Sequence, residues 1–247
     1  GYLFFSIVPV EVNVENDTID LEMRIREGKQ ATINKVSVKG NTRTNDHVVM
    51  RELRTRPGQL FSRSDIIRTT RELAQLRYFD PEKIVPTPIP NATDGTVDIE
   101  YKVEETSSDQ VELSGGWGYG RVVGTLGLSF NNFSARNLFN PKAWRPIPTG
   151  DGQKLSVRMS SYGKGYVSYS ASFTEPWLGG RKPNSFSVSY YHSLFSNGLS
   201  KDNENYYSFV IDGLSFMLGK RLEWPDDFFT LKLQQYFCFR HGYRHIS

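Results

Sequence analysis

Long segments in which apolar and polar side chains alternate occupy the second half of the chain, and they limit its fold more than any other feature. In the first such segment Val111 and Leu113 alternate with Glu112 and Ser114. A period of two places one set of side chains on each face of an extended strand. The pattern recurs in residues 126–130, 154–160, 167–173, 185–190 and 229–239, and less cleanly in 206–220.

The length of these segments indicates where such a sheet lies. They run for about 9–14 residues, which suits a tilted strand that crosses a bilayer, whereas strands of soluble sandwiches usually stop at about five or six. One face is apolar and aromatic, and the other carries mainly Ser, Thr, Lys, Arg and Gln, which suits a wet lumen. We expect the N-terminal strands of an antiparallel transmembrane β-barrel. A soluble β-sandwich is the alternative.

Residues 1–105 mix strand and helix signals and are rich in Val, Ile, Glu and Arg. Ser62 is a candidate N-cap, with Asp65 three residues later and Phe61 and Ile66 in the positions of a hydrophobic staple. The expected elements are a strand at 33–39, a helix capped by Thr44, a helix capped by Ser62, and strands at 83–90 and 95–104. This order, β-α-α-β-β, predicts a small α+β domain.

Three prolines distinguish the strand expected at residues 83–90. Pro86, Pro88 and Pro90 follow one another at period two, so their missing N–H groups lie on one side of an extended chain. Proline is confined to sheet edges for this reason. The pattern predicts an edge strand that cannot accept a further strand on that side. A proline-rich loop without a strand is the alternative.

Six stretches, taken in order, resemble one known family over essentially the whole chain. KVSVKGNTRTNDHVVMREL, PGQLFSRSDIIRTTRELAQLRYFD and GTVDIEYKVEE resemble a POTRA domain, in particular the last POTRA before the barrel in the BamA family. NNFSARNLFNPKAW, SYSASFTEPWLGGRKPNSFSVSYYHS and GLSFMLGKRLEWPDDFF resemble the first barrel strands of Bacteroidetes-type members.

The resemblance implies a division of the chain into three parts. Residues 1–29 correspond to the closing strands of a preceding POTRA, 30–105 to the last POTRA, and 106–247 to the N-terminal part of the barrel. Barrels of this family have about sixteen strands, of which the alternation accounts for about seven here. We therefore expect a fragment of a longer protein.

The resemblance also implies a function and a location. Members of the family fold and insert outer-membrane β-barrel proteins, which are their clients, and they bind accessory lipoproteins at the POTRA domains and contact outer-membrane lipid. The barrel lies in the outer membrane and the POTRA domains lie in the periplasm. Two alternatives stay open: a POTRA-containing pore of the two-partner-secretion type, which has the same order of domains, and a POTRA scaffold with a passive barrel.

The first barrel strand is the candidate functional site. Its glycines weaken strand packing and permit bends, which a seam that opens laterally requires; glycines that relieve crowding in a barrel are the alternative reading. The expected lateral-gate residues are Val111, Glu112, Leu113, Ser114, Gly115, Gly116, Trp117, Gly118 and Tyr119.

The connections between strands are expected to alternate between the two sides of the membrane. Residues 131–152, 175–184 and 221–227 then face the periplasm, and their tryptophans suit an interfacial belt or core packing. The first of these connections is long and apolar, with Phe133, Leu138, Phe139 and Trp144. We expect it to fold against the end of the barrel.

The helices of the expected POTRA are basic. Arg43, Arg51 and Arg54 are the candidate residues for docking an accessory protein, and a solvated helix face is the alternative reading.

Other classes of function have little support in the sequence. The net charge is only +3, which gives no indication of nucleic-acid binding, and the single cysteine, Cys238, excludes an internal disulfide. The four histidines lack the spacing of metal ligands, and the glycines of residues 116–120 lie in a strand pattern with no helix after it. We expect no enzymatic activity, no metal site and no cofactor.

Overall fold

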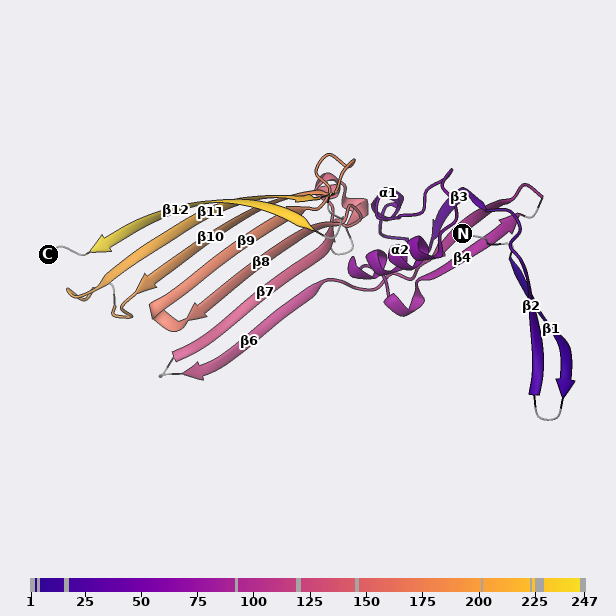
Figure 1. Ribbon diagram of the computed structural model, residues 1–247. Coiled ribbons are helices and arrows are strands. Elements are labelled where there is room, and N and C mark those ends of the chain that lie inside the picture. Colours follow the sequence, from indigo (N-terminus) through magenta and orange to yellow (C-terminus); the bar gives the residue numbers. More distant parts are fainter. Residues whose placement is uncertain are drawn as a thin grey trace. The chain divides into compact units, whose positions relative to one another are not determined.

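The computed structural model describes residues 3, 5–15, 18–91, 93–118, 121–144, 147–200, 202–222, 224 and 229–244 (Figure 1). Contacts between residues divide the chain into two compact units, Gly1–Thr106 and Ser107–Ser247. In the part of the chain described above, no helix combines the length and the apolar character needed to cross a membrane.

Unit 1 begins with a two-stranded antiparallel hairpin of β1 (Ser6–Glu15) and β2 (Thr18–Arg26). The register pairs Ile7 with Ile25 and Pro9 with Met23, so one face of the hairpin is apolar. Ile7, Met23 and Ile25 are each about half exposed or more. An isolated hairpin of this kind is marginally stable in water. The assignment of residues 1–29 to a preceding POTRA stays a prediction.

The rest of unit 1 is a three-stranded sheet with two α-helices. The elements in chain order are β3 (Thr32–Lys39), α1 (Asp46–Met50), α2 (Arg63–Gln75), the 3₁₀ turn η1 (Pro81–Lys83), β4 (Val85–Asn91) and β5 (Thr96–Lys102). The strand order is β3-β5-β4, with β3 parallel and β4 antiparallel to the central β5. The order β-α-α-β-β is confirmed. The core between sheet and helices includes the fully buried Val48, Leu73, Phe79, Ile99 and Tyr101.

The two helix starts differ in how well the sequence marks them. The Ser62 hydroxyl accepts a hydrogen bond from the Asp65 backbone N–H at 3.3 Å, which confirms the predicted cap of α2. The predicted cap of α1 is wrong, because Asn45 and not Thr44 occupies the N-cap position. Thr44 is buried instead, and its backbone N–H donates to the Glu105 carboxylate at 2.7 Å.

The proline strand lies at a sheet edge, as predicted. β4 pairs only with β5 among the described strands, and Pro86, Pro88 and Pro90 face Tyr101, Ile99 and Val97. Hydrogen-bonded and non-bonded pairs alternate in an antiparallel ladder, so three prolines at period two leave the bonds of the residues between them intact. The outer side of β4 therefore lacks N–H donors at all three positions.

Unit 2 is one seven-stranded antiparallel sheet in which every strand pairs with its neighbours in the chain. The strands are β6 (Gln110–Gly118), β7 (Arg121–Phe133), β8 (Gln153–Tyr162), β9 (Tyr166–Glu175), β10 (Asn184–Ser196), β11 (Tyr207–Arg221) and β12 (Thr230–Arg244). β6 and β12 form its two edges (Figure 1). The predicted number of strands and their alternation are confirmed. The short 3₁₀ turn η4 (Gly163–Gly165) joins β8 to β9.

The register puts like side chains in rows across this sheet. One face carries apolar rows, such as the residues at positions 111, 128, 157, 171, 190, 214 and 237. The opposite face carries a row of serines at positions 129, 156, 172, 189 and 215, in which the Ser156 and Ser172 hydroxyls lie 2.7 Å apart. Large apolar side chains such as Leu113 and Leu233 are more than two thirds exposed, so the apolar face has no covering layer within the described chain.

The connection between β7 and β8 only partly follows expectation. Its base is packed, since Asn132, Phe133 and Ser134 are buried and the Phe133 ring meets Phe173 edge-on. The prediction that its apolar residues fold against the end of the barrel is wrong for the tip. Leu138, Phe139 and Trp144, on and beside the 3₁₀ turns η2 (Arg136–Phe139) and η3 (Pro141–Ala143), are exposed.

The junction between the two units is short, because hydrogen bonds tie the residues before it to unit 1 and the residues after it to unit 2. The Glu105 carboxylate accepts hydrogen bonds from the Thr42 hydroxyl and from the backbone N–H groups of Arg43 and Thr44, at 2.7–3.0 Å. The Thr106 N–H donates to Tyr78 in unit 1, and the Ser108 carbonyl accepts from Asn131 in unit 2. The chain therefore passes from one unit to the other within very few residues.

Glu105 gives the junction a dependence on pH. Partial burial raises the pKa of Glu105, but the hydrogen bonds from Thr42, Thr44 and Arg43 outweigh it and hold the pKa below its ordinary value. A lowered pKa stabilises the fold above the pKa of the unfolded chain, and this contribution is lost as pH falls through the folded pKa. We expect Glu105→Gln to weaken the attachment of residues 42–44 by about 1 kcal/mol at neutral pH, allowing for the exposure of the carboxylate.

Hydrogen exchange of the amides of Arg43 and Thr44 in the full chain measures this effect. Their protection factors should fall about fivefold in Glu105→Gln at pH 7, and the difference should shrink as pH falls below the ordinary Glu pKa of about 4.3 and disappear below the lower pKa of the folded state. Glu104→Gln is the control, because within the described residues the Glu104 carboxylate pairs only with the exposed Lys83. Equal protection in Glu105→Gln and wild type at pH 7 would contradict the assignment.

Candidate lateral seam at the first strand of the sheet

The predicted gate residues lie together on β6, the first strand of the sheet. Their side chains alternate between the two faces, with Val111, Leu113 and Trp117 on the apolar face, and Leu113 and Trp117 are 80% and 75% exposed. Among the described strands only β7 pairs with β6. Tyr119, also predicted as a gate residue, lies outside the described residues.

Glycines face one another where β6 and β7 pair. Gly115 lies opposite Gly124, and Gly116 lies opposite Val123. A Cβ atom on Gly124 would approach the Ser114 carbonyl oxygen to 3.2 Å, which is tight. No side-chain pair stabilises the ladder at the Gly115 position, and cross-strand pairs are what normally stabilise a sheet. At Gly115 the two strands are thus held together by backbone hydrogen bonds alone, and the next large side chain along β6, Trp117, is the register partner of Val122.

An ion pair holds the N-terminal half of β6, residues 110–114, to the sheet. Glu112 on β6, Gly127 on β7 and Arg158 on β8 form one row on the polar face, and Arg158 Nη2 donates to Glu112 Oε2 at 2.5 Å. A Cβ atom on Gly127 would lie 3.2 Å from that oxygen. The glycine therefore leaves the space through which the two side chains meet across the intervening strand. This pair was not predicted from the sequence, in which a lone Gly between Leu126 and Leu128 is its one signal.

The three arginines predicted to dock a partner differ in their surroundings. The Arg54 guanidinium binds both carboxylate oxygens of Glu72 at 2.8–3.1 Å, and Arg68 binds the same carboxylate. The Arg51 side chain is nine-tenths buried, with its Nε 3.8 Å from Glu52. Arg43 alone of the three is exposed. Arg51 and Arg54 belong to the framework of unit 1.

Comparisons with known proteins agree with this arrangement. The POTRA family described as "surface antigen variable number repeat" matches residues 31–106. The outer membrane protein assembly factor BamA of Neisseria meningitidis serogroup B is 30% identical over 181 residues, which cover 72% of this chain and 20% of BamA. BamA of Nitratidesulfovibrio vulgaris is 32% identical over 177 residues, 71% of this chain and 20% of the relative.

The chain is a BamA relative with a POTRA domain. It spans about a fifth of the length of the curated relatives it matches. In fold it resembles the crystal structure of Haemophilus ducreyi BamA lacking POTRA domains 1–3, with a TM-score of 0.71, 20% identity, and coverage of 99% of this chain and 42% of that one. CdiB from Acinetobacter baumannii has a similar fold at 14% identity and a TM-score of 0.57, over 98% of this chain and 43% of CdiB.

The relationship to BamA gives the location of the sheet, and the order of the chain lets us infer its orientation. β6–β12 are N-terminal strands of an outer-membrane β-barrel, and the POTRA domain lies in the periplasm. β6 starts a few residues after the POTRA domain, so the end of the sheet at Gln110 is periplasmic. The antiparallel order places the β7–β8 and β9–β10 connections at that same end. The apolar face is the one that suits lipid.

Removing the ion pair should loosen β6 without unfolding the sheet. Glu112 and Arg158 are each about half exposed, so the pair contributes less than about 1 kcal/mol. In Arg158→Gln we expect the β6 amides to exchange up to about fivefold faster than in wild type, measured by hydrogen exchange of the complete protein in lipid vesicles. Gly127→Val should have the same effect, because its side chain occupies the space between the charges.

Lys154→Gln is the matched control, since Lys154 lies on the same strand and face as Arg158 and the structure shows no ion pair for it within the described residues. Its β6 exchange should stay at the wild-type rate. Unchanged exchange of β6 in Arg158→Gln would show that the pair does not hold the strand.

Proposed function

We propose that this protein folds and inserts outer-membrane β-barrel proteins, with β6 as one side of a lateral seam. The observation that carries the proposal is a glycine-paired strand at the edge of the sheet, which follows directly after the POTRA domain in the chain. The BamA relatives are named as outer membrane protein assembly factors, which supports assembly as the activity. The proposed function is not catalytic and requires no cofactor.

The edge of β6 supplies the physical basis. In a complete barrel this edge meets the closing strand, because β6 is the first strand of the sheet. An unpaired edge in lipid leaves each N–H and C=O group unsatisfied at a cost of several kcal/mol. A client strand satisfies these groups by adding to the edge, as in other cases of β-augmentation. The incoming strand therefore gains its hydrogen bonds within the membrane plane.

The two halves of β6 have separate parts in this proposal. Gly115 and Gly116 let the C-terminal half of β6, residues 115–118, bend away from β7. The Glu112–Arg158 pair keeps the N-terminal half, residues 110–114, in the sheet. The seam then opens without detaching the strand from the barrel. Client β-barrel proteins and outer-membrane lipid are the partners that this function requires.

Docking of an accessory lipoprotein at the POTRA domain is part of the same proposal. Arg43 is the residue that supports it, since it is exposed beside Glu105 at the junction. Arg43→Glu should lower recovery of accessory proteins that copurify with the complete protein. Arg54→Glu is unsuitable as a test, because it breaks the pairing with Glu72 and so disturbs the fold. Unchanged recovery with Arg43→Glu would remove Arg43 from the docking surface.

Locking the seam tests the main proposal. In a Cys238→Ser background, a disulfide between Ser114→Cys and the closing strand of the complete barrel should reduce client insertion at least tenfold, since about 1.4 kcal/mol or more of edge pairing is lost. Insertion is measured with purified protein in vesicles, before and after a reductant is added. The reductant should restore it.

A second disulfide provides the control. Ser114→Cys with Thr125→Cys joins β6 to β7, because the two residues are register partners. The other side of β6, which faces away from β7, stays free to pair with a client strand. This variant should insert clients at no less than half the wild-type rate.

Normal insertion with the seam locked would contradict the proposal. Depletion in cells separates it from secretion: broad loss of outer-membrane barrels supports assembly, and loss of one secreted substrate supports a pore.

A further inference from the structure

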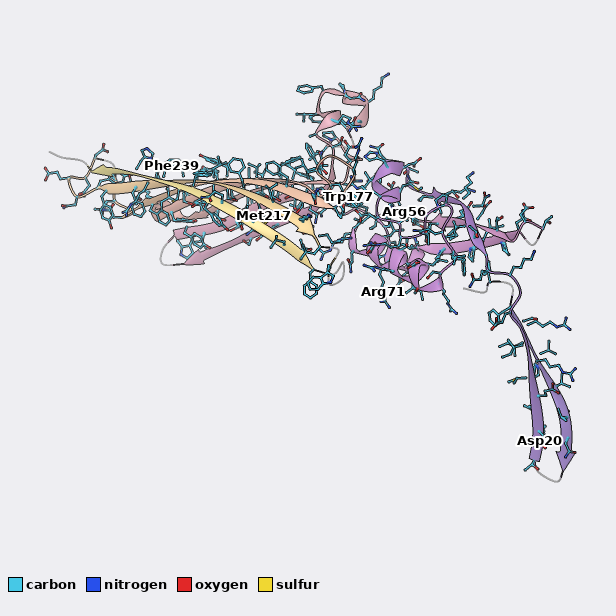
Figure 2. All side chains as sticks on the ribbon, turned by 45° about the horizontal axis from the view of Figure 1, so that its top comes forward. Asp20, Arg56, Arg71, Trp177, Met217 and Phe239 are labelled. Atoms are coloured by element: carbon cyan, nitrogen blue, oxygen red, sulfur yellow. The ribbon has the colours of Figure 1, made fainter. Side chains whose placement is uncertain are left out.

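The loop between β7 and β8 exposes large apolar side chains at the periplasmic end of the sheet. Phe139 is 92% exposed, and Leu138 and Trp144 are 43% and 47% exposed. Figure 2 shows this loop, in pink, standing clear of the sheet. Exposed apolar residues scattered singly need no explanation, but three within seven residues form a patch.

The exposure belongs to a folded loop. At its base the Ser134 hydroxyl donates to the buried Asp151 carboxylate at 2.6 Å, and the Gly152 N–H donates to the Asn132 side chain at 2.9 Å. At its tip the Trp144 indole N–H donates to the Leu138 carbonyl at 3.3 Å. These bonds close the loop on itself and leave the Phe139 side chain exposed.

The charges of the loop are almost all positive. Arg136 and Lys142 are exposed on either side of Phe139, and the sequence adds Arg145, which lies outside the described residues. Asp151 is the one carboxylate among residues 134–152, and it is buried against Ser134. The surface of the described loop thus combines apolar side chains with cations and presents no anion.

The neighbouring connection at the same end has the same character. Between β9 and β10, Leu178 is 48% exposed and is followed by the exposed Arg181 and Lys182. The pairing of Lys154 with Thr174 places the two connections at one end of the sheet. The third periplasmic connection differs, since the sequence of residues 222–229 contains three acidic residues.

We propose that residues 134–144 form an interfacial anchor, which inserts Leu138, Phe139 and Trp144 into the periplasmic leaflet and binds anionic phospholipid headgroups through Arg136 and Lys142. Aromatic residues prefer the membrane interface, and segments that lie in it combine an apolar face with Lys and Arg. The loop follows directly from a membrane-spanning strand, so it lies within reach of the headgroups. The anchor depends on the location of the sheet and not on the assembly activity.

Fluorescence of a labelled loop tests the anchor. The complete protein, with Cys238→Ser and Phe139→Cys, is labelled with an environment-sensitive fluorophore and inserted into vesicles of phosphatidylcholine alone or mixed with phosphatidylglycerol. We expect quenching by lipids that carry a spin label near the headgroup, stronger in the anionic vesicles. A basic residue beside an anionic surface strengthens binding about fivefold, so Lys142→Gln should weaken loop binding by that factor in anionic vesicles and little in neutral ones.

A label at Leu199→Cys is the matched control, because Leu199 is a similarly exposed apolar residue in the extracellular connection between β10 and β11, which has a carboxylate nearby at Asp202. It should show no dependence on lipid charge. A label at position 139 that stays in water in both kinds of vesicle would overturn the anchor. If the quenching of the label at position 139 is the same in anionic and neutral vesicles, and is unchanged by Lys142→Gln, the role of anionic headgroups is overturned. Protection that appears only after a protein is added would assign the patch to a protein partner.

Discussion

The backbone hydrogen-bond ladder of the sheet is the constraint on which the rest of unit 2 depends. Every strand from β7 to β11 is paired on both sides, and lipid supplies no substitute for a missing pair. The apolar residues on one face and the serines on the other follow from a sheet that separates lipid from water. A strand at the edge of such a ladder is where the structure can change at the lowest cost.

Within that constraint, the features of β6 act in opposite directions. The pairing of Gly115 with Gly124 removes side-chain packing at the C-terminal half, and the Glu112–Arg158 pair across Gly127 adds an attraction at the N-terminal half. The hydrogen bonds of Glu105 and Thr106 hold the preceding residues to the POTRA domain. The strand therefore has an added attraction near its start and lacks a side-chain pair at Gly115.

Much of the fold was predictable because its signals are local. Period-two alternation identified the strands of unit 2, the prolines of β4 identified a sheet edge, and Ser62 marked the start of α2. The errors came from contacts between residues far apart in sequence. Asn45 is the N-cap of α1, and Thr44 is bonded through its N–H to Glu105, some sixty residues later. The Glu112–Arg158 pair and the exposure of Phe139 likewise depend on register and loop closure.

The central claim is that a client strand pairs with β6. Disulfide capture during insertion tests it most directly, with single cysteines placed along β6 at Leu113 or Ser114, or on the interior strand β8 at Val157, each against a cysteine in the terminal strand of a client. We expect capture at one register on β6 and none on β8, whose two sides are already paired. Equal capture by β6 and β8, or none by β6 while clients insert normally, would contradict it.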